Sequence, residues 1–162
     1  MAKSITDKND IKRYFDDFRE CTFKAIVEIF SYVGEESVKK AREDHERNWK
    51  DQTGNLRSSI GYMVTYNGKE VLRNGFTPTQ GKTGNGAEGQ AEGQRVIEGL
   101  KGTNTEGFAL IVVAGMNYAE HLEASDKYDV LSHVELFARK RMPEMMERIP
   151  ERIETKMKEK GW

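Results

Sequence analysis

Apolar residues recur every three or four positions along residues 10–48, the spacing that places them on one face of a helix. We therefore expect a long amphipathic helix whose apolar face packs on the core. Thr6, Asp7 or Asn9 could cap its start, and Gly34 is the interior position where a break or kink is most easily formed. The apolar stripe consists of Ile11, Tyr14, Phe15, Phe18, Thr22, Ala25, Ile26, Ile29, Val33, Val38 and Ala41.

Three later stretches are typical of strands. The first two, "SSIGYMVTY" and "NGKEVLRNGF", meet at Asn67-Gly68, a dipeptide that favours a tight hairpin turn. The third, "GFALIVVAG" at residues 107–115, is a continuous apolar run bounded by glycines and too short for a typical helix. The pattern predicts a hairpin and a third strand.

Residues 74–107 have a different composition. They hold nine of the fifteen glycines and include an exact tandem repeat, "AEGQAEGQ", at Ala87 to Gln94. Such a segment has little apolar surface to bury, so we expect a flexible Gly-rich insertion loop over residues 74–107. Within it, "QRVIEGL" could form a short helix or strand.

The C-terminal part predicts a helix from Leu131 that is interrupted or restarted near Pro143, because proline removes a backbone donor and clashes with the preceding turn. Beyond Pro143 the expected apolar side is Met145, Met146, Ile149 and Ile153. The order helix, hairpin, Gly-rich loop, strand, helix predicts an α+β fold: a small antiparallel sheet packed against a long N-terminal helix and a C-terminal helix. A single domain over residues 1–162 fits this length.

Net charge, cysteine count and the lack of long apolar stretches disfavour several classes of function for this chain. The 162 residues carry a formal charge of −1, so neither a polyanionic partner nor an anionic membrane is indicated. The only cysteine, Cys21, excludes an internal disulfide or a thiolate metal cluster within one chain. The start lacks a signal-peptide core, and no stretch approaches the length of a membrane span, so the default expectation is a soluble cytoplasmic product.

The tripeptide Gly81-Lys82-Thr83 raises the question of a phosphate-binding loop. That loop needs a glycine five positions before Gly81, whereas the preceding glycine here is Gly75, six positions earlier, with Phe76 in the required place. The sequence that follows, "GNGAEGQAEGQ", is unfavourable for starting a helix. The acidic residue that would position magnesium at the end of another apolar strand is also missing. A nucleotide hydrolase is therefore disfavoured.

Other catalytic patterns are also missing. His45, His121 and His133 lie far apart in sequence, and "EHLE" at Glu120 to Glu123 is not the His-Glu-x-x-His zinc motif. No Gly-x-Ser-x-Gly motif activates a serine. We expect no enzyme, and predict no catalytic, cofactor-binding or metal-binding residue.

Two stretches are distinctive: "WKDQTGNLRSSIGY" at Trp49 to Tyr62 and "GMNYAEHLE" at Gly115 to Glu123. In them the chain resembles the head-tail joining and tail-completion proteins of tailed bacteriophages, found also in prophages and gene transfer agents. In that family a long first helix ends in a Thr-Gly-x-Leu-x-x-Ser-Ile segment, and a later strand runs into Tyr-Ala and a glutamate. The sequence "EASDKYDVL" at residues 123–131 differs from the Glu-Phe-Gly-Thr turn that is usual in the family. The matching residues are Thr53, Gly54, Leu56, Arg57, Ser58, Ser59, Ile60, Tyr118, Ala119 and Glu123.

Physical roles can be suggested for several of these residues. Gly54 would stop the long helix in a left-handed conformation, and Leu56 and Ile60 would anchor the first strand. Arg57 would point elsewhere, available to a neighbouring subunit, and Tyr118 would pack its ring on the sheet end. Maintenance of the fold remains the alternative explanation for the whole set.

The resemblance implies a structural virion protein: a homo-oligomeric ring, typically six-fold, in the neck or at the tail terminus, assembled in the bacterial host cytoplasm. Its partners would be further copies and neighbouring connector or tail proteins, with DNA only as cargo through the channel. Residues 74–107 would be an adaptable arm that orders against a neighbouring ring.

Two alternatives stay open. One is a nucleic-acid-binding or nucleotide-binding module of mobile-element origin, using Lys82 and the basic residues Arg139, Lys140 and Arg141. The other is a toxin, inhibitor or small enzyme from a mobile element.

Overall fold

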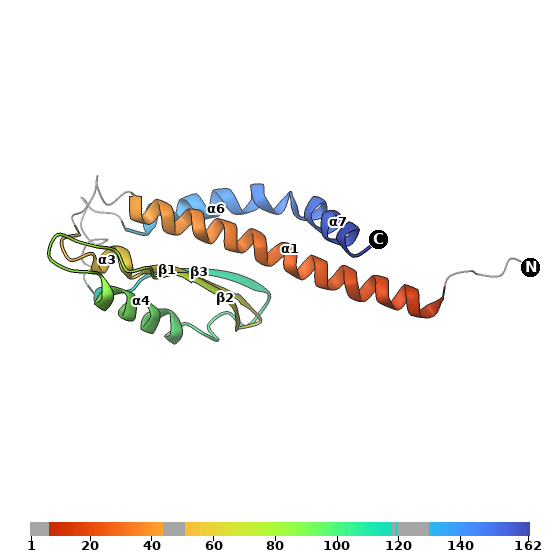
Figure 1. Cartoon of the computed structure of the whole chain (residues 1–162), viewed down its shortest axis with the longest axis horizontal. Coiled ribbons are helices and arrows are strands. Elements are labelled where there is room, and N and C mark those ends of the chain that lie inside the picture. The colour runs from red at the N-terminus through yellow and green to blue at the C-terminus, as the bar shows by residue number, and fades with distance from the viewer. Residues whose placement is uncertain (1–6, 44–50, 118, 120–129) are drawn as a thin grey trace, which may run out of the picture.

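A three-stranded antiparallel sheet lies between two helical layers. The computed structural model describes residues 7–43, 51–117, 119 and 130–162. The strands β1 (Ile60–Tyr66), β2 (Lys69–Gly75) and β3 (Phe108–Ala114) take the order β2-β1-β3. Helix α1 (Lys8–Glu43) covers one face with α6 (Ser132–Met146) beside it, and α4 (Ala87–Gly99) covers the other (Figure 1). The expected α+β fold, with its small sheet and its N-terminal and C-terminal helices, is confirmed.

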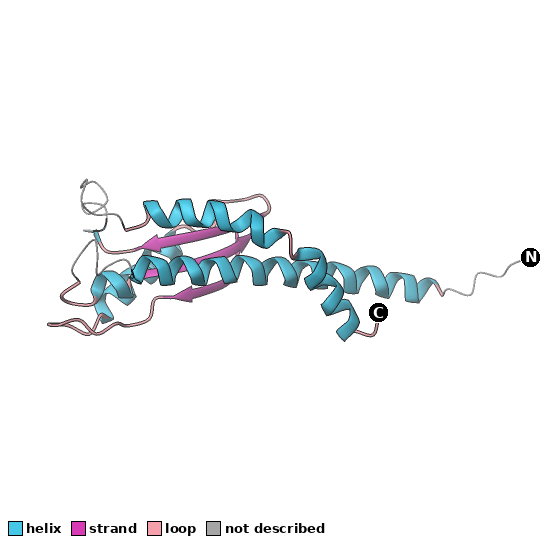
Figure 2. Cartoon of the chain, turned by 90° about the horizontal axis from the view of Figure 1, so that it is seen from above, coloured by secondary structure: helices cyan, strands magenta, loops and turns pink. Residues whose placement is uncertain are grey.

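Helix α1 is long and uninterrupted. Asp7 caps its start, since the Asp7 carboxylate accepts a hydrogen bond from the Asn9 amide at 3.0 Å. Gly34, where a break was expected, lies within the continuous helix. A Cβ at Gly34 would stand 2.4 Å from Cδ2 of Tyr62, so the glycine gives the tyrosine ring room against the helix. The N-terminal part of α1 extends well beyond the sheet (Figure 2).

The hairpin β1-β2 forms as predicted. Asn67 and Gly68 both have positive φ, 49° and 76°, as the tight turn between twisted strands requires. The side chain of Asn67 also accepts a hydrogen bond from the Gly107 amide at 2.8 Å, which fixes the start of β3 beside the turn. β1 is the central strand and is buried on both faces, because α1 covers Tyr62 and Val64 while the α4 side covers Met63.

The long Gly-rich loop expected over residues 74–107 is not what the structure contains. The tandem repeat forms most of α4, which runs from Ala87 to Gly99. Gly89 and Gly93 lie four residues apart on its buried face, and Ile97 continues that face into an apolar cluster with Met63 and Phe76. The glycines permit close packing of this helix, which the composition alone did not reveal.

The C-terminal helices break later than predicted. Pro143 lies inside α6, and the chain turns at Glu147 and Arg148 before α7 (Ile149–Glu159) begins. Pro150 falls in the first turn of α7, where a missing amide costs no helical hydrogen bond. The expected apolar side is partly wrong: Met145 is buried, but Met146 is exposed.

Candidate functional site

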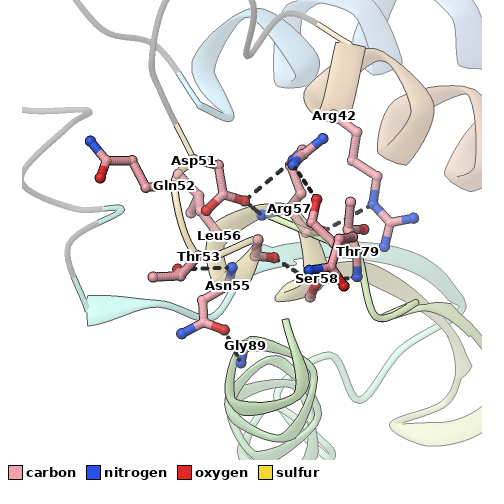
Figure 3. Close-up of polar contacts among 12 residues, drawn as sticks. Arg42, Asp51, Gln52, Thr53, Asn55, Leu56, Arg57, Ser58, Thr79 and Gly89 are labelled. Atoms are coloured by element: carbon pink, nitrogen blue, oxygen red, sulfur yellow. Dashed lines mark hydrogen bonds and ion pairs between the residues drawn. The ribbon is translucent and has the colours of Figure 1, made fainter. Parts of the chain in front are cut away.

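The first stretch of the family resemblance, from Thr53 to Ile60, lies in a compact junction at one end of the sheet. We use "glycine junction" for residues 51–60, which include the short helix α3 (Asn55–Ser58), together with residues 79–93 and 115–116 packed against them (Figure 3). Backbone approaches backbone here without intervening side chains. A Cβ at Gly54 would lie 1.9 Å from the Thr79 carbonyl oxygen, and one at Gly89 would lie 1.9 Å from the Asn55 carbonyl oxygen.

Gly54 has the left-handed conformation expected of it, with φ of 78°, but it serves a different purpose. It precedes α3 and does not end the long helix, whose last described residue is Glu43. Because α3 and the loop before α4 come into direct backbone contact at Gly54, no other residue type fits both its conformation and its space.

The N-terminus of α4 is capped by side chains of the junction. The side-chain oxygen Oδ1 of Asn55 accepts from the Gly89 backbone amide at 3.3 Å, and the side-chain Nδ2 of Asn55 donates to the Glu88 carboxylate at 2.8 Å. Asn85 accepts from the Ala87 amide at 3.1 Å. The free amides that attract anions at a helix start are therefore partly satisfied from within the protein. Neither asparagine was singled out from the sequence.

The Gly81-Lys82-Thr83 tripeptide faces the same segment. The Thr83 amide donates to the Gln52 carbonyl at 3.0 Å, and the Gly81 amide donates to the Gly84 carbonyl at 2.8 Å. A helix does follow the tripeptide, contrary to expectation, but it starts only at Ala87. Two amides that a phosphate cradle would turn toward its anion are thus used in internal hydrogen bonds.

Two serines tie the parts of the junction together. Ser58 Oγ donates to the Gly54 carbonyl at 2.6 Å and accepts from the Thr79 amide at 2.8 Å. Ser59 Oγ lies 3.1 Å from the Gly115 amide, which also bonds to the Ser59 carbonyl at 3.2 Å. Both serines are fully buried, so these bonds satisfy groups that water cannot reach.

Arg57 is engaged within the chain, whereas we expected it to be available to a neighbour. Its Nε donates to Asp51 at 3.3 Å and a terminal nitrogen donates to the Gln80 carbonyl at 3.1 Å, leaving the side chain 19% exposed. Arg42 of α1 donates to the carbonyls of Arg57 and Ile60 at 3.0 and 2.9 Å. Burial lowers the pKa of the Arg42 guanidinium. Arg42 thus joins α1 to the junction, and Arg57 joins Asp51 to the loop at Gln80 within it.

Of the other residues that match the family pattern, some lie in the core, one lies at the surface, and two lie outside the described residues. Leu56 and Ile60 are buried, as anchors of the first strand should be, and Ala119 is buried in the same cluster. Thr53 is exposed, and its hydroxyl accepts from the Asn55 amide at 3.2 Å. Tyr118 and Glu123 lie outside the described residues, so their expected positions stay predictions.

A second polar cluster, not anticipated from the sequence, joins α1 to β1 and β2: the hydroxyl of the buried Tyr62 reaches Ser31 and the exposed side chains of Glu35 and Asn74. The Tyr62 hydroxyl lies 2.8 Å from the Ser31 hydroxyl and donates to Glu35 at 3.0 Å, and Asn74 also donates to Glu35. Burial is the main cause that raises the pKa of Tyr62 to about 12. These contacts fix the sheet against α1.

The described residues considered for metal binding are dispersed, and Arg139 and Arg141, considered for nucleic-acid binding, form ion pairs. Over the described ranges, no group of three His, Cys, Asp or Glu side chains is placed to hold a metal ion, and His45 and His121 fall outside those ranges. Arg141 pairs with Glu36 and Glu144, both at 3.0 Å, which raises the pKa of Arg141. Arg139 pairs with Glu135.

Comparison with known protein families, with curated proteins and with solved structures finds no match for this chain. Of the helices described, none combines the length and the apolar character needed to cross a membrane. The resemblance to phage head-tail joining proteins therefore stays a prediction from the two sequence stretches.

Proposed function

We propose that this chain is a structural virion protein of a tailed phage or prophage, forming part of the head-tail connector or of the tail terminus. One observation carries the proposal. The two stretches on which the resemblance rests, more than fifty residues apart in sequence, lie against each other at the contact of Ser59 with Gly115 and Met116. The described parts of the two stretches thus pack on each other, as expected if the resemblance reflects a shared fold.

The contacts of the junction favour a framework over a catalytic centre. Its serines, its arginines and the backbone amides of Gly81 and Thr83 form internal hydrogen bonds. Such a junction stabilises the joint between α1, the sheet and α4, and leaves the outer surfaces for assembly. We infer that subunit contacts in the ring are made by those outer surfaces and not by Arg57.

A ring requires two different surfaces on each subunit that meet head to tail. The edge strand β3 is one such surface, because among the described strands it pairs only with β1. An apolar groove of about 850 Å³ lies between β3 and α6, with Glu135 and Arg139 among its lining residues. The ring, typically six-fold, would join neighbouring connector or tail proteins in the virion after assembly in the bacterial host cytoplasm. DNA would pass through it only as cargo.

Helix α4 changes the expectation that residues 74–107 form an adaptable arm. Residues 87–99 already pack on the sheet in the isolated chain, so they are not a segment that waits for a neighbour to become helical. Exposed Lys82 and Thr83, at the outer side of the loop before α4, are the part of this segment that a neighbour could still contact.

The proposal is tested by removing the gene from the phage or prophage that encodes it. The expected result is filled heads and separate tails, or tails of abnormal length, in electron micrographs, with normal particles restored by the gene in trans. Normal infectious particles without the protein would overturn the proposal.

A nucleic-acid-binding function makes a different prediction. Its basic residues Arg139 and Arg141 are paired with carboxylates here. Fluorescence anisotropy with labelled single-stranded and double-stranded DNA at low salt, where phosphate contacts are strongest, should show no binding by the purified chain. Saturable binding that weakens with added salt would favour that alternative.

A further inference from the structure

The N-terminal part of α1 presents an apolar surface that the described chain does not cover. Ile11, Tyr14, Phe15 and Phe18 are between 39% and 54% exposed. Their spacing of three and four residues puts them on one side of the helix. The N-terminal part of α1 runs past the sheet (Figures 1 and 2). Four large apolar side chains on successive turns of one helix face form a patch of the kind that marks an interaction site.

The apolar stripe of α1 continues N-terminally beyond the part of the helix that the sheet and the C-terminal helices cover. From Cys21 onward the same helical face is buried, with Ala25, Ile29 and Val33 at or below 1% exposure under the sheet and the C-terminal helices. The apolar spacing of three and four residues continues N-terminal to Cys21 without a change to polar residues. The exposed part is therefore an extension of a packing face and not a set of scattered surface residues.

Helix α7 turns this patch into a groove. Tyr14 and Phe18 line it from α1, while Ile153, Met157 and Trp162 line it from the C-terminal end, around a space of about 580 Å³. Tyr14 stacks on Phe18 at 6.4 Å and meets the edge of Trp162 at 5.2 Å between ring centroids. We call this surface, Ile11, Tyr14, Phe15, Phe18, Ile153 and Trp162, the distal face.

Two ion pairs and a hydrogen bond join the C-terminal segment to α1 beside the groove. Lys160 bonds to Asp17 at 2.6 Å and to Glu20 at 2.7 Å, and the Trp162 indole donates to Asp17 at 2.9 Å. These contacts lock the end of the chain beside α1. A preformed two-helix groove of this kind accepts an apolar helix stripe with little further ordering.

We propose that the distal face binds the distal face of a second copy of this chain. The stripe Ile11 to Phe18 of each copy would lie in the groove between α1 and the C-terminal end of the other, so that helices from two copies close one apolar core. The contact is two-fold, because each copy supplies the same stripe and the same groove. It is separate from the head-to-tail contacts of the proposed ring and does not depend on the virion function.

The exposed area suits such a contact. Aromatic side chains offer roughly 150–250 Å² each, so the four half-exposed residues leave on the order of 400 Å² of apolar surface uncovered. A standard interface takes about 800 Å² from each partner, of which somewhat more than half is apolar.

Charge also permits self-association. Residues 7–20 carry five acidic and four basic groups, whereas residues 149–162 carry three acidic and four basic groups. The proposed contact sets the first segment of one copy against the second segment of the other. The two surfaces have opposite net charges, so no like-charge barrier opposes the contact.

The test is sedimentation velocity of the full chain over a wide micromolar range of concentration. We expect a concentration-dependent dimer whose dissociation constant rises about thirtyfold or more in Phe15→Glu and in Ile11→Glu, since each change puts two charges into the apolar contact. Leu136→Glu is the matched control: Leu136 is 71% exposed on α6, away from the distal face, and its variant should dimerise like the wild type. Circular dichroism should be unchanged in all three variants because the replaced side chains are exposed.

Three outcomes would overturn the inference. The wild-type chain could stay monomeric throughout the range, or it could form an oligomer that Phe15→Glu leaves intact. In the third, a monomer could bind phosphatidylcholine vesicles through Phe15, which would assign the distal face to a lipid surface. A ring whose assembly is indifferent to Phe15→Glu would leave the proposed virion function standing while removing this inference.

Discussion

Gly34 of α1 lies directly against the ring of Tyr62 of β1: a Cβ at Gly34 would stand 2.4 Å from Cδ2 and 2.6 Å from Cε2 of that ring. Tyr62 is fully buried and is the largest of the fully buried side chains. The helix thus accepts a residue of low helical propensity where the sheet needs space for an aromatic ring.

Replacement of Gly34 should therefore destabilise the protein despite a gain in helical propensity. We expect Gly34→Ala to lower the free energy of unfolding by about 1–3 kcal/mol, because the ring must move within a packed core. Urea unfolding followed by circular dichroism measures the change. Gly99→Ala is the matched control, since nothing lies within 4 Å of a Cβ there, and it should be neutral or stabilising by up to about 1 kcal/mol.

The glycines of the tandem repeat test whether α4 packs as described. A Cβ at Gly93 would lie 2.4 Å from the Ser59 carbonyl oxygen and 2.7 Å from Phe76. We expect Gly93→Ala to destabilise the chain by about 1–3 kcal/mol in the same urea experiment. A stabilising effect near the roughly 1 kcal/mol of helical propensity would mean instead that the segment is a loose helix without close contacts.

Ser59→Ala tests the contact between the two stretches that carry the family resemblance. The change removes the hydroxyl that accepts from the Gly115 and Met116 amides inside the protein. We expect a loss of about 1–3 kcal/mol of stability, because the Met116 amide loses its acceptor while the Gly115 amide keeps only the Ser59 carbonyl. In Thr155→Ala, which removes an exposed hydroxyl on α7, the change should stay within about 0.5 kcal/mol. Equal effects of the two substitutions would contradict the described junction.

The buried tyrosine predicts a dependence of stability on alkaline pH. Its pKa is raised to about 12, mainly by burial, from an ordinary value of 10.0. The folded state therefore favours the protonated phenol, and this contribution is complete below pH 10 and is lost as the pH rises from about 10 toward 12. Unfolding at a series of pH values should show this loss in the wild type and a smaller one in Tyr62→Phe. Identical pH profiles would contradict the assignment.

The tripeptide Gly81-Lys82-Thr83 predicts no nucleotide affinity, because its amides bond to Gln52 and Gly84 carbonyls. Calorimetric titration with magnesium ATP and with magnesium GTP should give no saturable heat, in the wild type as in Lys82→Ala. Saturable binding that Lys82→Ala abolishes would restore the phosphate-binding interpretation.

The elements of the fold were largely predictable because hydrophobic periodicity reports local structure directly. The stripe from Ile11 to Ala41 predicted α1, and Asn67-Gly68 predicted the hairpin turn. A short helix or strand was allowed at "QRVIEGL", and α4 includes most of that stretch, but the tandem repeat before it was predicted to be flexible because of its glycine content. The spacing of Gly89 and Gly93, one helical turn apart, was the available signal of a close-packed helix face.

The site was less predictable, since its contacts are long-range. Leu56 and Ile60 could be assigned to the core from their residue type. The partners of Arg57 could not, because Asp51 and Gln80 approach it only after the loop before α4 folds back on α3. Likewise, the exposure of Phe15 depends on where the C-terminal helices stop covering α1, which no local pattern reports.

The proposed virion function is tested most directly by electron cryomicroscopy of particles from the phage or prophage that encodes this chain. We expect a ring at the head-tail junction or at the tail terminus whose density fits the arrangement of α1, the sheet and α4. Purified infectious particles that contain no copy of the chain, by mass spectrometry and in the reconstruction, would contradict it.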